Sequence, residues 1–205
     1  MIILLNLILS CKNQNKQPNM ENLARELQSL VDKGKTPSVS YLLFNSDKVL
    51  HSYQAGYADV LNKKNTSANT TYSAFSVSKT FTALAILQLA EKGKLTLEDE
   101  VKMHISDFPY PSEIKIRHLL THTAGLPNPL PLRWVHAPEQ HQSFDRDAFF
   151  KKVSSKNPKV KSSPNEKFKY SNLGYYYLGK IIENVSGQSY EDYVQDHIIN
   201  PLGIE

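Results

Sequence analysis

The stretch "TYSAFSVSKTFTALAILQLAEKG", residues 71–93, reads as an apolar helix that carries a lysine close to its start. An ammonium group that leaves water without a compensating charge is costly, and no acidic residue lies near Lys79 in the sequence. Residues i and i+3 of a helix are neighbours on one face, so Lys79 can reach the hydroxyl of Ser76. We interpret Ser76 as a nucleophile that this lysine activates, at a helix N-terminus whose N–H groups favour a developing oxyanion.

The pattern S-x-x-K is short, and the chain contains a second copy, Ser112 and Lys115 in "PSEIK". That copy is flanked by proline and is followed by no long apolar helix, so we attribute it to chance. The first copy is followed by about four turns of apolar helix, which would hold Ser76 and Lys79 on a rigid, buried element.

A second motif could supply the group that moves the proton of the serine. "FKYSNLGYYYLG" contains Tyr170 and Asn172, the only Y-x-N in the chain, just ahead of a strongly apolar stretch. A tyrosine can take a proton if a nearby cation lowers its pKa, and the asparagine amide can hold a substrate carbonyl and orient Lys79. The alternative is that Tyr170 is one aromatic residue among many and that Asn172 is a helix N-cap. Two S-x-N matches look like solvated loop: Ser155 with Asn157, and Ser163 with Asn165.

The N-terminus differs from the rest of the chain. Residues 1–11, "MIILLNLILSC", form an apolar run that ends at the only cysteine, so no internal disulfide can form. "LILSC" resembles a bacterial lipobox, and we predict a lipoprotein signal over 1–11, an acylated Cys11 and a polar tether over 12–20. The alternative is an ordinary short hydrophobic start, because no Lys or Arg precedes the apolar run.

The remaining residues, 21–205, are predicted to form one domain. A net charge of +4 over 205 residues is too small an excess to indicate binding to nucleic acid. Helical spacing over 22–34 ends at Gly34, and two strands are expected over 38–44 and 48–60 with a tight turn between them. Beyond Gly93 the chain reads as short helices and loops, with no transmembrane span.

Three segments in this order resemble the serine β-lactamase and penicillin-binding protein superfamily, in its class C-like branch of β-lactamases, DD-peptidases and related esterases. They are "FSVSKTFTALAILQLAEKGKLTLEDEVKMHI" (75–105), "IKIRHLLTHTAGLP" (114–127) and "FKYSNLGYYYLGKIIENVSGQSYEDYVQDHIINPLGI" (168–204). The resemblance implies an α/β plus all-α fold of the β-lactamase/transpeptidase type, an antiparallel sheet flanked by helices with a helical subdomain. It also implies that Ser76 is acylated, Lys79 activates it, Tyr170 is the base, Asn172 binds substrate, and no cofactor is needed.

Motifs that are typical of other hydrolase classes are incomplete or missing in this sequence. His118 and His122 have a spacing that could bind zinc. A metalloprotease needs a glutamate directly after the first histidine, and this chain has Leu119 there. The segment instead resembles the family's structural helix and turn, which Gly125 would close. No G-x-S-x-G elbow is present, which argues against an α/β-hydrolase. The family usually has glycine where this chain has Asn165, so the turn before Tyr170 should differ slightly.

The loop over 127–142 contains four prolines and Trp134, and we expect it to border the site as a stiff rim. The family's third motif, K-T-G or H-x-G, does not follow Asn172 here. We therefore expect the chain to be truncated, with the C-terminal strands of the sheet missing. We also expect the 205 residues alone to be neither stably folded nor active, since a two-stranded hairpin is marginal in water.

The sequence predicts a lipid-anchored serine hydrolase of the bacterial cell envelope, on the periplasmic side or at the outer membrane. It would act through an acyl-enzyme on an amide or ester: a β-lactam, a D-peptide or a simple ester. The expected partners are such a small-molecule or peptide substrate and, through the lipid, a membrane. The alternative is a non-catalytic remnant, or a penicillin-binding lipoprotein without turnover.

Overall fold

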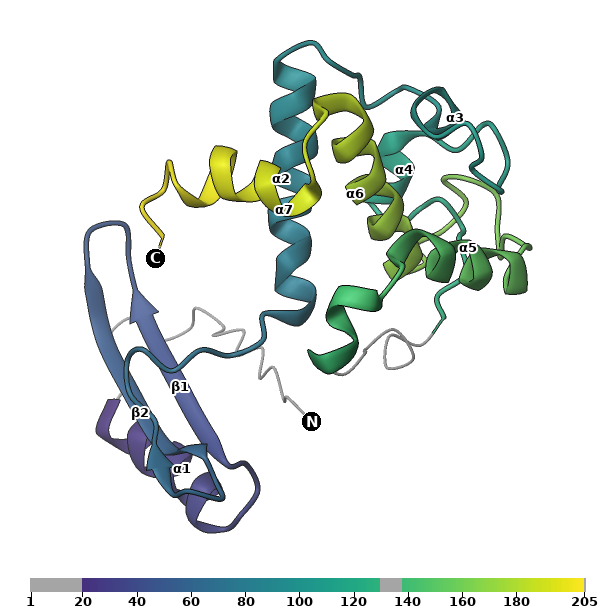
Figure 1. Ribbon diagram of the computed structural model, residues 1–205. Coiled ribbons are helices and arrows are strands. Elements are labelled where there is room, and N and C mark those ends of the chain that lie inside the picture. Colours follow the sequence, from purple (N-terminus) through teal and green to yellow (C-terminus); the bar gives the residue numbers. More distant parts are fainter. Residues whose placement is uncertain (1–19, 130–137, 205) are drawn as a thin grey trace. The chain divides into compact units, whose positions relative to one another are not determined.

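The structure is a computed structural model that describes residues 20–129 and 138–204 (Figure 1). The chain divides into two compact units, Met1–Ser73 and Ala74–Glu205. Cys11 and the predicted tether, apart from its last residue Met20, lie outside the described residues, so the division into signal, tether and domain stays a prediction. No helix in the described part of the chain is long and apolar enough to cross a membrane.

The first unit is a helix and a small antiparallel sheet. Helix α1 (Met20–Asp32) ends ahead of Gly34, as predicted. Strands β1 (Ser38–Phe44) and β2 (Val49–Asp59) match the predicted pair closely, in a register that places Tyr41 opposite Tyr53. A short third strand, β3 (Lys64–Asn65), adds to β2 and was not predicted, because two residues carry no periodic pattern.

The hairpin between β1 and β2 is closed by a side chain. The Asn45 Oδ1 atom accepts hydrogen bonds from the backbone N–H groups of Asp47 and Lys48, both at 2.9 Å. An asparagine that bonds the backbone two residues on is typical of tight turns. The turn predicted at 45–47 is therefore confirmed.

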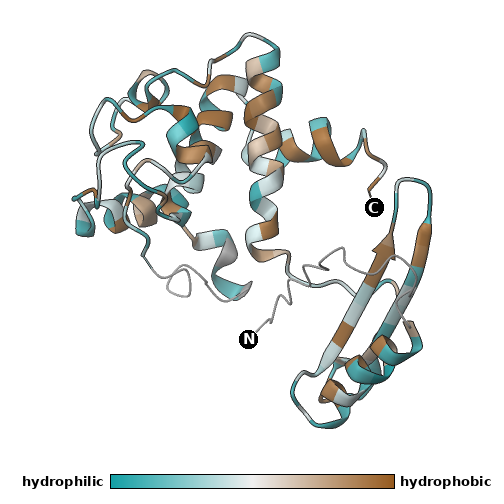
Figure 2. Ribbon diagram, turned by 180° about the vertical axis from the view of Figure 1, so that it is seen from behind, coloured by the Kyte–Doolittle hydropathy of each residue, from teal (hydrophilic) through white to brown (hydrophobic). Residues whose placement is uncertain are grey.

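This unit has almost no core of its own. Among its described residues Ala55 is the only buried hydrophobic residue, and α1 buries none. Figure 2 shows hydrophobic residues along both long strands, and several large ones are exposed: Leu42, Phe44, Val49, Leu50, Tyr57, Val60 and Leu61. Large apolar side chains exposed on and beside a sheet are a known aggregation hazard. The expected instability of the whole chain stays a prediction, and these exposed residues give it a structural basis.

The second unit is helical and contains a continuous core. Helix α6 (Asn172–Ser186) packs against α2 (Ser78–Glu91), α4 (Ile116–Leu120) and α7 (Tyr190–Val194). The most deeply buried side chains come from these helices and the connections between them: Ile86, Val101, Ile114, Ile116, Leu173, Leu178, Ile181 and Ile182. The remaining elements are α3 (Val101–His104), α5 (Arg146–Lys156), and the turns η1 (Phe75–Val77), η3 (Pro138–Ser143) and η4 (Gln195–Ile199).

The helix predicted over 71–93 is shorter and less buried than expected. Helix α2 begins only at Ser78, and a single 3₁₀ turn, η1, precedes it. Its buried face is formed by Thr82, Ala85, Ile86 and Leu89, whereas Leu84 and Leu87 are 41% and 48% exposed. Gly93, with φ +66°, follows α2 as a stop, as predicted.

The turn after α4 also differs from the prediction. Helix α4 ends at Leu120, and the first left-handed residue after it is His122, with φ +58°. Gly125, with φ +68°, lies three residues further on, where a Cβ atom would come within 2.1 Å of the Ser162 carbonyl oxygen. Gly125 therefore does not close the helix. It permits the close approach of two loops. The backbone N–H of Lys161 donates a hydrogen bond to the Gly125 oxygen at 2.7 Å.

We predict that Gly125→Ala destabilises the second unit more than Gly93→Ala does. Both glycines are left-handed, so each alanine should cost about 1–2 kcal/mol, but nothing lies within 4 Å of a Cβ at Gly93. Overpacking against Ser162 should add roughly 1–3 kcal/mol at Gly125. Urea unfolding followed by far-UV circular dichroism measures both. Equal losses would mean that the close approach to Ser162 has no energetic weight.

Candidate active site

The predicted nucleophile and its lysine lie on two consecutive elements. Ser76 is in the middle of η1, and Lys79 is the second residue of α2. The Lys79 Nζ atom donates a hydrogen bond to Ser76 Oγ over 3.2 Å. The spacing of three residues therefore brings the two groups together, although Ser76 is not on the long helix itself.

The Y-x-N motif meets the S-x-x-K motif across 94 positions of sequence. Tyr170 Oη lies 2.7 Å from Ser76 Oγ, and Lys79 Nζ donates to Asn172 Oδ1, also at 2.7 Å. Tyr170 Oη donates to the same Asn172 oxygen at 3.2 Å. The four residues proposed from sequence thus form one hydrogen-bonded group, in which Asn172 orients Lys79 as predicted.

Burial and the neighbouring polar groups act in opposite directions on the pKa of the Tyr170 phenol. Partial burial raises its pKa, but the Lys79 ammonium group and the bond with Ser76 outweigh burial, and the net pKa lies below the usual value for tyrosine. The Lys79 Nζ atom lies 5.1 Å from the centre of the Tyr170 ring. A cation that favours the phenolate makes this tyrosine a better proton acceptor near neutral pH.

The site lies on an open surface, which corrects the expectation of a buried element. Ser76 is exposed, Tyr170 is 38% exposed, and Lys79 is half-buried. The cost of a buried ammonium group is therefore reduced by residual solvent and by the acceptor on Asn172. This answers why a lysine is tolerated near the start of an otherwise apolar helix.

The residue before the nucleophile has a strained backbone. Phe75 has φ +46°, in the left-handed region that non-glycine residues rarely adopt, and its side chain is 69% exposed. Such a conformation costs about 1–2 kcal/mol and persists only where neighbouring structure holds it. Here it turns the chain from the loop before Phe75 into η1, with Ser76 at its centre.

Tyr170 and Asn172 are held by residues that sequence analysis did not identify. Ser171 is the N-cap of α6: its hydroxyl donates to the Pro127 oxygen at 2.7 Å and accepts from the Gly174 N–H at 3.3 Å. Asn172 is the first helical residue rather than the N-cap, and both its backbone N–H and its side-chain amide donate to Asn128 Oδ1. No local pattern in the sequence would have indicated Asn128, because its partner lies 44 residues away.

The expected rim loop is only partly visible. Its first residues border the site through Pro127 and Asn128, and Trp134 lies outside the described residues. The turn before Tyr170 contains Asn165, which has φ +63°. Asparagine tolerates this left-handed conformation better than most residues, so it serves where the family usually has glycine.

The rival motifs do not join the site. Lys115 forms an ion pair with Glu98 at 2.9 Å, and no bond is recorded between Lys115 and Ser112. Ser155 was expected in a solvated loop but lies within α5, where its hydroxyl donates to the Lys152 oxygen. His118 and His122 each accept a backbone N–H at Nδ1, from Lys115 and Ser171 respectively, and the described residues hold no group of three or more metal-ligating side chains.

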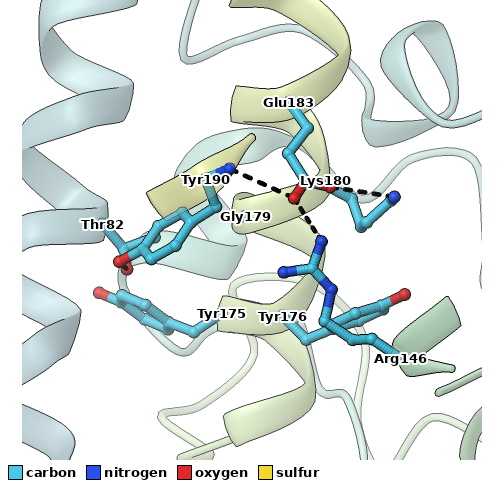
Figure 3. A pocket seen from close by; sticks show the side chains of 8 residues that line it. All are labelled: Thr82, Arg146, Tyr175, Tyr176, Gly179, Lys180, Glu183 and Tyr190. Atoms are coloured by element: carbon cyan, nitrogen blue, oxygen red, sulfur yellow. Dashed lines mark hydrogen bonds and ion pairs between the residues drawn. The ribbon is translucent and has the colours of Figure 1, made fainter. Parts of the chain in front are cut away.

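A cavity of about 220 Å³ is lined by residues of α6 together with Thr82, Arg146 and Tyr190 (Figure 3). One lining residue, Tyr175, also lies beneath Lys79, whose Nζ atom is 5.5 Å from the centre of its ring. Another, Glu183, contacts the guanidinium of Arg146, the ammonium of Lys180 and the Tyr190 N–H. Burial raises the pKa of Glu183, but the two cations outweigh it and keep the carboxyl ionised. The Glu183 carboxylate and the two cations pair with one another, so we interpret this cavity as a junction of α5, α6 and α7.

The comparisons with known proteins agree with this geometry. The family model described as "Beta-lactamase" matches residues 23–205. "Penicillin-binding protein 4*" of Bacillus subtilis is 34% identical over 192 residues, covering 93% of this chain and 41% of that protein. The chain thus spans less than half the length of this relative.

Solved structures show the same fold. The octameric penicillin-binding protein homologue from Pyrococcus abyssi has a TM-score of 0.75 and 30% identity, covering 90% of this chain and 43% of that one. EstCE1, a hydrolase with promiscuous acyltransferase activity, has a TM-score of 0.75 and 27% identity, covering 90% and 51%. These similarities confirm the predicted fold class.

We predict that Lys79→Met raises the pKa of Tyr170, because the substitution removes the cation that favours the phenolate. Nuclear magnetic resonance of ¹³Cζ-labelled tyrosine measures this titration, with Tyr170→Phe to assign the signal. Lys92→Met is the matched control, since Lys92 also lies over a tyrosine ring, that of Tyr193, outside the site. An unchanged Tyr170 titration in Lys79→Met would contradict the electrostatic account.

Proposed function

We propose that this chain, which belongs to the β-lactamase family, carries the acylating residues of a serine hydrolase that acts on an amide or ester. The observation that carries the proposal is the joint contact of Ser76 Oγ with Tyr170 Oη at 2.7 Å and with Lys79 Nζ at 3.2 Å. A serine hydroxyl is a weak nucleophile until a neighbour accepts its proton, and both candidates for this task are in place.

The proposed reaction begins with transfer of the Ser76 proton to the phenolate of Tyr170. The serine oxygen then forms a bond to the substrate carbonyl carbon, and the carbonyl oxygen becomes an oxyanion. The N-terminus of α2 is the expected source of stabilising N–H groups, which remains a prediction from sequence. Tyr170 next gives the proton to the leaving amine or alcohol as the bond to it breaks, which produces the acyl-enzyme.

Hydrolysis of the acyl-enzyme would reuse the same groups. Tyr170 accepts a proton from a water molecule that attacks the ester on Ser76, and returns a proton to the serine oxygen as the acid departs. Lys79 stays bonded to Asn172 throughout, so its charge is fixed beside Ser76 Oγ and Tyr170 Oη. The remaining amide hydrogen of Asn172 is available for a substrate carbonyl.

The substrate class is proposed from the relatives together with this chemistry. A penicillin-binding protein and a hydrolase with acyltransferase activity are among the similar proteins, and both descriptions fit an acyl-enzyme. We place the chain in the class C-like branch because a tyrosine, rather than a carboxylate, faces Ser76. The proposed substrates are β-lactams, D-peptides and simple esters.

We predict that a fluorescent penicillin or a fluorophosphonate labels the chain and that Ser76→Ala abolishes labelling. Lys79→Ala and Tyr170→Phe should each slow acylation by about 100- to 10,000-fold, as expected for a positioned proton-transfer group, and should change the unfolding midpoint little. Ser112→Ala is the matched control, because it removes the serine of the other S-x-x-K pattern. Intact-protein mass spectrometry measures the rates.

Three outcomes would count against parts of the proposal. Well-folded protein that no probe labels would favour the non-catalytic remnant. Acylation of Tyr170→Phe at the wild-type rate would remove Tyr170 from the role of base. Labelled protein that does not turn over nitrocefin, a D-Ala-D-Ala peptide or p-nitrophenyl acetate would be a penicillin-binding protein without turnover.

The proposed location rests on the sequence at Cys11, which lies outside the described residues. A lipidated cysteine would tether the folded part of the chain to the bacterial envelope, since two or more acyl chains give stable anchoring. We predict that the protein partitions with membranes and that Cys11→Ala releases it into the periplasmic fraction. Continued membrane association of that variant, measured by fractionation and immunoblotting, would refute the lipobox.

A further inference from the structure

His122 contacts the chain on both sides of the proposed base. Its backbone oxygen accepts the Lys169 N–H at 2.7 Å, and its Nδ1 atom accepts the Ser171 N–H at 3.2 Å. Tyr170 lies between these two donors. One residue therefore fixes the backbone immediately before and immediately after the tyrosine that faces Ser76.

The imidazole ring of His122 also packs against the side chain of Tyr170. Their ring centres lie 4.5 Å apart with an interplanar angle of 41°, and Tyr175 contacts the same imidazole at 5.1 Å. Because a backbone N–H can only donate, Nδ1 must carry a lone pair, and the proton of the neutral ring is on Nε2. The hydrogen bond from the Ser171 N–H thus depends on an uncharged histidine in one tautomer.

We propose that His122 is the positioning residue for Tyr170, and that protonation of His122 releases the Tyr170 segment. The inference rests on the proposed function for its catalytic consequence, but its structural part can be tested without any reaction. A protonated Nδ1 atom cannot accept the Ser171 N–H. The bond would be lost, and with it one of the two attachments that place Tyr170 beside Ser76.

The surroundings of His122 favour the neutral ring. The titratable groups that face it are Lys79 from α2, Tyr170 from the preceding loop and Tyr175 from α6. Burial and the Lys79 ammonium group both lower the pKa of His122. The folded state therefore binds this proton less readily than the unfolded chain, so stability and position are kept above about pH 6.5 and decline as the pH falls below it.

The backbone of His122 permits a clean pair of substitutions. With φ +58° the position suits glycine and asparagine, which tolerate the left-handed region better than other residues. His122→Asn keeps an acceptor near Nδ1 but cannot titrate, whereas His122→Gly removes the acceptor and the ring. His118→Gly is the matched control, because His118 is buried and likewise accepts a backbone N–H at Nδ1, from Lys115.

The first test uses the ¹³Cζ titration of Tyr170, which needs no activity. We expect the lowered pKa of Tyr170 in the wild type and in His122→Asn, and a return toward the usual value in His122→Gly as the phenol leaves Lys79 and Ser76. His118→Gly should lower the unfolding midpoint without moving this pKa. A Tyr170 titration that is the same in His122→Gly as in the wild type would overturn the inference.

The second test follows the Ser171 amide and the acylation rate from pH 8 to pH 5. In the wild type the Ser171 amide proton signal should shift as the His122 ring titrates, and in His122→Asn it should stay constant. The acylation rate should fall on the order of tenfold through the same titration in the wild type, and His122→Asn should remove that limb of the profile. A Ser171 signal that ignores the histidine titration would refute the mechanism. A signal that follows it in a protein that no probe acylates would retain the positioning role and reject the hydrolase.

Discussion

The bond from Lys79 Nζ to Asn172 Oδ1 joins the first turns of α2 and α6, and the rest of the site depends on it. The two helices are packed together by buried aliphatic residues further along their length. That packing sets where their N-termini meet, and the single bond then fixes the ammonium group beside the serine hydroxyl. A core of apolar contacts thereby places a polar group with far more precision than an exposed lysine would have alone.

The site is built from two classes of element with different tasks. The helices α2 and α6 supply Lys79 and Asn172, and short irregular segments supply Ser76 and Tyr170. Irregular segments need their own attachments, because no helical ladder holds them. For Tyr170 the segment from His122 to Asn128 provides these attachments, accepting hydrogen bonds from Lys169, Ser171 and Asn172. Ser76 is held in the 3₁₀ turn η1.

Sequence analysis identified the four residues that meet in the candidate site, because their types and local spacing are themselves the signal. The serine and lysine are three residues apart, and the tyrosine and asparagine are two apart, so each pair is visible in a short window. It could not identify Asn128 or the role of His122, whose partners lie more than 40 residues away. It also overestimated burial at α2, since an apolar stretch says which face can be buried but not whether anything covers it.

Three of the four left-handed residues other than glycine in the described part of the chain lie in segments that form the site, and the fourth, Lys63, lies in the first unit. Phe75 precedes Ser76, His122 contacts Tyr170, and Asn165 lies in the loop that leads to Tyr170. For His122 and Asn165 the side chain compensates, because each accepts a hydrogen bond at the position where it turns the chain. Phe75 has an exposed ring and no such bond recorded among the described residues. Phe75 opens the 3₁₀ turn that places Ser76 opposite Tyr170, so its strained backbone belongs to the segment that positions the serine hydroxyl.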